Sequence, residues 1–261
     1  MSDFDRNASA RWRQGAARAG RAEIDQGLRS YMLGVYNNMV VGLALTGAVA
    51  LGVHMLAVTT DPALGVPAGR HLLLTSFGVT LYTTPLKWVV MLAPLAFVLF
   101  FSVRINQMAA STARGLFLAF AASMGLSLST VLLVYTGTSV ANAFFVTAAA
   151  FGGLSLYGYT TKRDLGPMGA FMVMGLFGLV IASLVGLFLQ STGFQFALSI
   201  LSVLIFSGLT AWDTQAIKEM YYASDDYEVA TKKSVSGALR LYLDFINIFM
   251  AVLRLTGSQN D

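Results

Sequence analysis

Long apolar runs recur along almost the whole chain, and this feature limits the possible folds more than any other. Seven such segments are each about as long as the helix of roughly 20 residues that crosses a bilayer. They are residues 31–57, 88–103, 115–135, 140–160, 168–189, 196–212 and 238–255. Backbone groups in hydrocarbon must bond to one another, and the runs are continuous rather than alternating, so we expect helices and not a barrel. The sequence predicts an all-α integral membrane protein with seven transmembrane helices.

The composition excludes several classes of function. Of the 261 residues, 56% are hydrophobic and 11% are charged, whereas a soluble domain carries about 25% charged residues. Cysteine is absent and histidine occurs twice, so thiolate sites and histidine-rich metal sites are not expected. We therefore expect no nucleic-acid partner, no soluble enzyme and no organic cofactor.

The N-terminal stretch differs from the rest of the chain. Residues 1–30 are polar, with arginines and acidic residues interspersed and no apolar core, so they do not read as a cleavable signal peptide. We predict a cytoplasmic polar tail over residues 1–30 and a membrane domain over residues 31–257.

Basic residues are distributed unevenly among the expected loops. The side that carries the N-terminal tail also carries loops 105–114, 161–167 and 213–237, and most Lys and Arg residues of the chain fall there. The positive-inside rule places that side in the cytoplasm. Seven spans then predict a cytoplasmic N-terminus and an external C-terminus.

The last apolar segment contains a polar stripe. Arg240, Asp244 and Asn247 are spaced i, i+4 and i+7, so a helix places them on one face. Lipid cannot solvate these side chains, and the stripe must face protein or water. Because Arg254 adds a further charge, a re-entrant segment is the alternative to a seventh full span.

A second stripe is expected at the end of the sixth segment, where Thr210 and Asp213 are spaced i and i+3. The hairpin that follows can bring Asp213 close to Asp244. Two carboxylates on neighbouring helices suit either cation coordination with proton sharing, or acid–base hydrolysis. Aspartyl intramembrane proteases carry Gly-x-Gly before the second aspartate, whereas Tyr242 and Leu243 stand before Asp244 here. We therefore expect no enzyme.

Simpler interpretations of these charged residues also stand. Asp213 by itself fits an interfacial residue that faces cytoplasmic water. Arg240 fits a helical pair with Asp244, or a side chain that extends to the interface. Arg104, at the end of the second segment, fits an ordinary marker of the cytoplasmic side.

Small residues on two segments are spaced for close helix packing, in which backbones approach each other within the lipid. The alternative is that they line a pore. They are Ala44, Ala48 and Gly52 on the first segment, and Gly178, Ala182 and Gly186 on the fifth.

The C-terminal quarter resembles a known family. Asp213 is followed by Ile217 and Lys218 in an Asp-x-x-x-Ile-Lys pattern, and residues 241–247 read Leu-Tyr-Leu-Asp-Phe-Ile-Asn. Both patterns are similar to signatures of the Bax inhibitor-1/YccA family, also called the transmembrane Bax-inhibitor-motif family. Residues 161–165, Thr-Lys-Arg-Asp-Leu, resemble a loop element of the same family. With the seven-segment layout, the resemblance extends over about residues 28–257.

This resemblance implies a central seventh helix wrapped by the other six, and a pH-sensitive calcium leak with Asp213 and Asp244 as the sensor and possible Ca²⁺ ligands. It also implies a latch, an arginine at the cytoplasmic end of the second helix that binds the first aspartate, and Arg104 is the best match. Calcium-leak members have a glutamate in the second helix, which this sequence lacks.

A different role remains open from the same resemblance. Other bacterial relatives lack both aspartates and are associated with modulating a membrane-bound AAA protease. The alternative function is therefore an interaction partner of such a protease in membrane-protein quality control. The expected setting is a bacterial inner membrane, with the lipid bilayer and calcium ions as partners.

Overall fold

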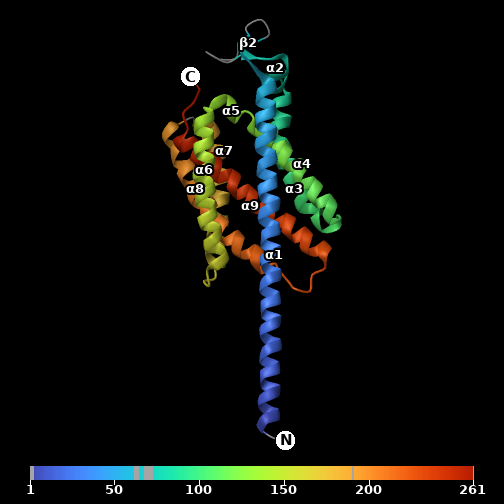
Figure 1. Ribbon diagram of the computed structural model, residues 1–261. Helices are drawn as coiled ribbons and strands as arrows, with labels where there is room; N and C mark the ends of the chain where they lie inside the picture. Colours follow the sequence, from blue (N-terminus) through green and yellow to red (C-terminus); the bar gives the residue numbers. More distant parts are fainter. Residues whose placement is uncertain (1–2, 62–64, 68–72, 190, 261) are drawn as a thin grey trace.

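The computed structural model describes residues 3–61, 65–67, 73–189 and 191–260, and the chain is predominantly helical (Figure 1). The long helices are α1 (Asp3–Ala57), α3 (Leu86–Arg104), α4 (Ala110–Leu128), α6 (Gly137–Thr160), α7 (Gly166–Leu189), α8 (Thr192–Glu219) and α9 (Tyr227–Thr256). Each contains one of the seven predicted segments, or most of it. Helix α1 passes the predicted domain boundary at residue 30 without a break.

The connections from α1 to α3, from α3 to α4 and from α4 to α6 hold short elements that the hydropathy pattern did not predict. The short elements are α2 (Ser76–Thr83), α5 (Val131–Val134), the 3₁₀ helix η1 (Ile105–Gln107), and strands β1 (Val58–Thr59), β2 (Val66–Pro67) and β3 (Leu73–Leu74). The strands form an antiparallel sheet of order β1-β3-β2, with Leu74 opposite both Val58 and Val66. The predicted segment 115–135 is divided into α4 and α5. Hydropathy marks what lies in lipid, and it does not register short elements at its border.

Six helices of the described part of the chain are long and apolar enough to cross a membrane. The longest is the part of α1 from Asp25 to Ala57, and the others lie in α3, α4–α5, α6, α7 and α8. Helix α9 has 30 residues, or about 45 Å at 1.5 Å per residue. It is long enough to span, but Arg240, Asp244 and Arg254 set it apart from the other six.

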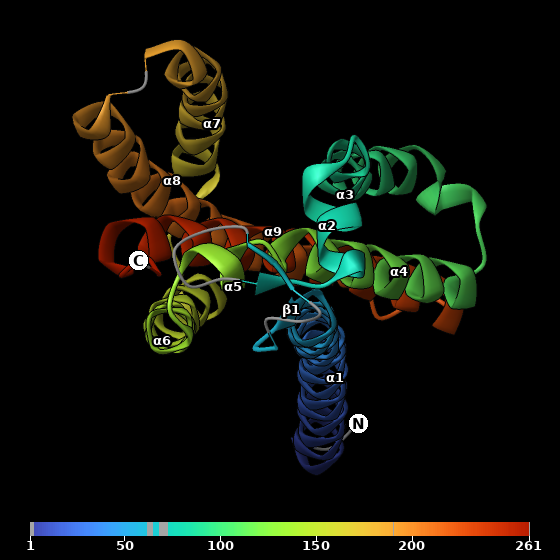
Figure 2. The ribbon, with the colours of Figure 1, turned by 90° about the horizontal axis from the view of Figure 1, so that it is seen from above.

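Helix α9 lies in the middle of the helical domain and packs against α1, α4, α6 and α8. Viewed from above, it runs between α1 on one side and α8 on the other, with α3 and α7 farther out (Figure 2). Helix α3 packs on α4, and α7 packs on α8. Four helices therefore pack against α9, while α3 and α7 form an outer layer on α4 and α8.

Tyr242 of α9 is one of the largest fully buried side chains among the described residues. The rings of Phe117 and Phe120 on α4 meet its ring edge to face, with centroids 5.9 and 5.3 Å away. The Tyr242 hydroxyl lies 2.7 Å from the Thr46 hydroxyl of α1, which also lies 2.8 Å from the carbonyl of Ala121. Aromatic contacts and a buried hydrogen bond thus join α1, α4 and α9 at one point.

The predicted packing faces of small residues are confirmed in part on α7 and are wrong on α1. On α7, a side chain at Gly186 would come within 3.1 Å of Gln195 on α8, and Ala182 packs against the apolar cluster of α7 and α8. Added side-chain atoms would meet open space at Gly52 and Gly178, and a groove is lined by Ala44 and Ala48. Close approach occurs instead at Gly125, where a side chain would come within 2.5 Å of the Thr46 carbonyl. A spacing of small residues permits close packing, but it does not determine which helix arrives there.

Candidate functional site

The polar stripe of α9 lines a cleft between α7, α8 and α9. The cleft has a volume of about 820 Å³. Its polar lining consists of Asp213, together with Ser183, Ser202, Arg240, Asp244, Asn247 and Arg254. Apolar side chains of α7 and α8 form the rest of the wall, among them Leu176 and Phe206. The three residues of the i, i+4, i+7 stripe therefore face the same partly polar cleft.

The two aspartates meet in this cleft. The carboxyl groups of Asp213 on α8 and Asp244 on α9 lie close enough to interact with each other. Asp244 is 4% exposed, and its Oδ2 atom has no hydrogen-bond partner among the described residues. Two carboxylates so close together do not both ionise cheaply, and one proton between them relieves the repulsion. The hairpin between α8 and α9 therefore brings the two acids into one cleft.

A different arginine accompanies the pair from the one predicted. The Arg240 Nη1 atom lies 3.6 Å from Asp213 Oδ1, and Arg240 stands one helical turn before Asp244 on α9. Arg104 is exposed at the end of α3, where its Nη1 lies 3.5 Å from Gln107 Oε1. The structure thus corrects the predicted latch, because Asp213 pairs with Arg240 and not with Arg104.

Two further predicted residues differ in their surroundings. Thr210 is buried, and its hydroxyl donates to the Phe206 carbonyl at 2.7 Å, so it bonds within its own helix and is not part of the cleft lining. Asn247 lines the cleft, with its amide nitrogen donating to the Leu243 carbonyl at 2.8 Å. Its side-chain oxygen remains available as an acceptor.

Sequence reasoning missed part of the site. Arg254 lies seven residues after Asn247 and lines the same cleft, so the helical period that revealed the stripe could also have extended it. Gln215 is a second example. Its side chain accepts from the Leu165 amide at 2.8 Å and donates to the Arg163 carbonyl at 2.9 Å. It thereby ties the linker between α6 and α7 to α8, two residues beyond Asp213, and no local pattern indicates this contact.

The side chains that line the cleft can be compared with the ligands that a calcium ion requires. Within the described ranges, no group of three or more His, Cys, Asp or Glu side chains comes together. Calcium takes six to eight oxygen ligands in a stable site, and the cleft offers two carboxylates, one amide oxygen and the hydroxyls of Ser183 and Ser202 beside the guanidinium groups of Arg240 and Arg254. Repulsion from the two guanidinium groups disfavours a permanently bound calcium ion at this lining.

Comparisons with known proteins agree over nearly the whole chain. The family model described as "Inhibitor of apoptosis-promoting Bax1" matches residues 28–261. An uncharacterized protein of Rickettsia prowazekii is 45% identical, over 91% of this chain and 93% of the relative. An uncharacterized protein of Caulobacter vibrioides is 43% identical over 100% of both chains. The inner membrane protein YbhL of Escherichia coli is 41% identical, over 89% of this chain and 93% of the relative.

Proposed function

We propose that this chain, which belongs to the Bax inhibitor family, is a calcium leak pathway of a bacterial inner membrane gated by the Asp213–Asp244 pair. Family membership confirms the resemblance of the C-terminal motifs. The observation that carries the proposal is the contact between two carboxyl groups inside a cleft of a membrane protein. Ionisable groups at such depth are costly and mark ion or proton pathways.

A seventh crossing by α9 is part of the proposal, and the C-terminal tail supports it. The Asn260 amide donates to the Val134 carbonyl at 2.8 Å, and the Thr136 amide donates to the Ser258 carbonyl at 3.1 Å. The tail therefore lies at the α5–α6 connection, while the N-terminus lies at the opposite end of the molecule (Figure 1). A C-terminal reporter should read as external. A cytoplasmic readout would favour the re-entrant alternative.

Two opposing effects determine how flux should depend on pH. The Asp213–Arg240 ion pair takes the place of the latch in this proposal. A proton on Asp213 removes the negative charge that holds Arg240 and so breaks that pair. The same proton removes an anionic oxygen that calcium needs. Low pH therefore breaks the Asp213–Arg240 pair and weakens calcium binding. High pH keeps the pair intact and strengthens calcium binding. We expect calcium flux to be greatest at an intermediate pH, with both flanks belonging to the pair rather than to either residue.

The test is calcium entry into liposomes that contain a calcium-sensitive dye, measured from about pH 6 to 8. Asp213→Asn and Asp244→Asn each remove proton sharing with little change in shape, and either should flatten the pH response. Glu228→Gln is the control, because Glu228 lies at the start of α9, paired with Lys232 and outside the cleft.

Two results would overturn the proposal. If both Asn variants elute as monodisperse proteins and keep the full wild-type pH response, the pair is not the sensor. If the wild-type protein carries no calcium at any pH, the leak itself is wrong, and the alternative role as a partner of a membrane AAA protease becomes the working hypothesis.

A further inference from the structure

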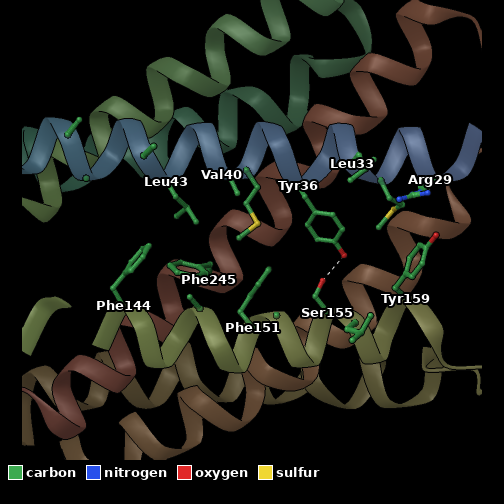
Figure 3. A pocket seen from close by; sticks show the side chains of 18 of the residues that line it. Arg29, Leu33, Tyr36, Val40, Leu43, Phe144, Phe151, Ser155, Tyr159 and Phe245 are labelled. Carbon is green, nitrogen blue, oxygen red and sulfur yellow. Dashed lines mark hydrogen bonds between the residues drawn. The ribbon is translucent and has the colours of Figure 1, made fainter. Parts of the chain in front are cut away.

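A second and larger hollow lies on the side of α9 that faces away from the aspartate cleft. It is a groove of about 1120 Å³ between α1 and α6, with Phe245 of α9 reaching into it (Figure 3). The view from above shows α1 and α6 as separate columns on either side of this gap (Figure 2). No step of the proposed calcium pathway uses the groove.

The walls of the groove are apolar along most of its length. On α1 they run from Leu33 through Val40 and Leu43 to Leu51. On α6, a side chain built at Gly152 would meet no atom within 4 Å. The α6 wall of the groove therefore leaves unfilled space beside Gly152. An open apolar groove within a membrane is filled either by the acyl chains of lipid or by another helix.

One end of the groove is basic. Arg29 and Tyr159 both lie at that end (Figure 3). Lys218 lies beside them, with its ammonium 5.3 Å from the centre of the Tyr159 ring and bonded to the Tyr159 carbonyl at 2.8 Å. Arg29 is exposed, and it forms no ion pair with another residue of the described part. The guanidinium of Arg29 and the phenol of Tyr159 thus lie at one end of the apolar groove.

We propose that this groove is a binding site for an anionic phospholipid, with its phosphate at Arg29 and Tyr159 and an acyl chain along the α1–α6 gap. Arg29 stands two residues before the apolar part of α1, which is the depth of lipid headgroups. Guanidinium and phosphate form charge-assisted, two-pronged hydrogen bonds. The proposed cytoplasmic position of this end also places it in the leaflet that holds anionic lipids.

A transmembrane helix of a second copy is the competing occupant. It would use the same open wall at Gly152, but it would bring only apolar side chains and no anion to Arg29. The basic end therefore favours the phospholipid, and the experiment separates the two by charge and by oligomeric state.

The experiment measures how much phosphatidylglycerol the full-length protein retains after extraction from vesicles that are mostly phosphatidylcholine. Gly152→Trp fills the groove, and Gly153→Trp is the matched control, since the adjacent glycine also faces open space but does not line this groove. Arg29→Gln removes the cation, and Arg29→Lys keeps it. Gly152→Trp and Arg29→Gln should each lower retention about fivefold, and the other two variants should match wild type.

The outcomes are decisive if all four variants elute as monodisperse proteins. Equal phosphatidylglycerol retention in Gly152→Trp and Gly153→Trp would overturn the proposal. Loss of a dimer in Gly152→Trp, with lipid retention unchanged, would assign the groove to a second copy instead. If the protein retained phosphatidylcholine as well as it retained phosphatidylglycerol, the groove would not select anionic lipid, and the proposed contact of Arg29 would be wrong. Calcium flux is not the readout, so failure here would leave the leak proposal intact.

Discussion

The two faces of α9 are built in opposite ways. The face toward α1 and α4 is closed, because Val235, Ala238, Leu241 and Tyr242 have no exposed surface. The face toward α7 and α8 borders a cleft, and the side chain of Arg240 there is 44% exposed. Helix α9 therefore has one tightly packed face and one polar face that borders a cleft. We infer that the closed face fixes α9, so that the charges on the open face can change partners without loss of the fold.

Helix–helix contacts on the closed face differ in kind from those in the cleft. Around Thr46 they consist of backbone approach, ring edges and one hydrogen-bond cluster that joins three helices. In the cleft they consist of a carboxyl pair and an ion pair at 3.6 Å. Packing of the first kind has a single arrangement, whereas charge contacts of the second kind respond to protons and ions. Four substitutions test this division.

The largest effect is expected at Gly125, where α4 comes closest to the backbone of α1. Gly125→Leu would place a side chain against the Thr46 carbonyl and Val49, and backbone cannot yield as a flexible side chain can. We expect a loss of more than the roughly 3 kcal/mol typical of overpacked cores, seen as loss of monodisperse protein in size-exclusion chromatography. Gly115→Leu on the same helix meets open space and should behave as wild type.

The next effect is expected at Arg240, on the open face. Arg240→Ala removes the ion pair with Asp213, and partly exposed pairs contribute about 1 kcal/mol. If the pair is the latch, basal calcium flux in liposomes should rise about fivefold, and the free energy of unfolding should fall by no more than about 1 kcal/mol. Arg104→Ala should leave flux as in wild type. The opposite pattern, with a rise only in Arg104→Ala, would restore the latch expected from the sequence.

A substitution at Tyr242 should change the free energy of unfolding by a similar amount but should not change calcium flux. Tyr242→Phe keeps the ring and removes the hydrogen bond to Thr46, which should lower stability by about 1 kcal/mol. The pH response of calcium flux should stay intact, because the hydroxyl faces away from the cleft. Tyr227→Phe, at a residue that is 83% exposed, should change neither property. Equal melting temperatures for the two variants would show that the Thr46 contact contributes nothing measurable.

The smallest effect on stability is expected at Asn247. Its amide bonds to the Leu243 carbonyl within α9, so it joins no two helices. Asn247→Ala should change the free energy of unfolding by less than about 0.5 kcal/mol, measured by denaturation in mixed micelles. A loss as large as that of Tyr242→Phe would mean that the open face also holds the fold together.

Much of the membrane domain could be predicted from local sequence, because a helix is a local structure. Segment length and hydropathy located six spans and the long α9, and a period of 3.6 residues placed Arg240, Asp244 and Asn247 on one face. The family was also evident from short motifs and is confirmed by the family match. The seventh crossing, the orientation of the termini and the roles of the aspartates stay predictions.

The tertiary structure alone decided which side chains meet across helices. The helical period fixes which residues share a face, but the tilt and rotation of a neighbouring helix determine what that face meets. For this reason the sequence could pair Asp213 with Asp244 through a short hairpin, yet it assigned Arg104 where the structure has Arg240. For the same reason small residues were expected to pack at Gly52, whereas close packing occurs at Gly125. Within lipid, apolar faces gain little from choosing one apolar neighbour over another, so shape complementarity between whole helices makes that choice.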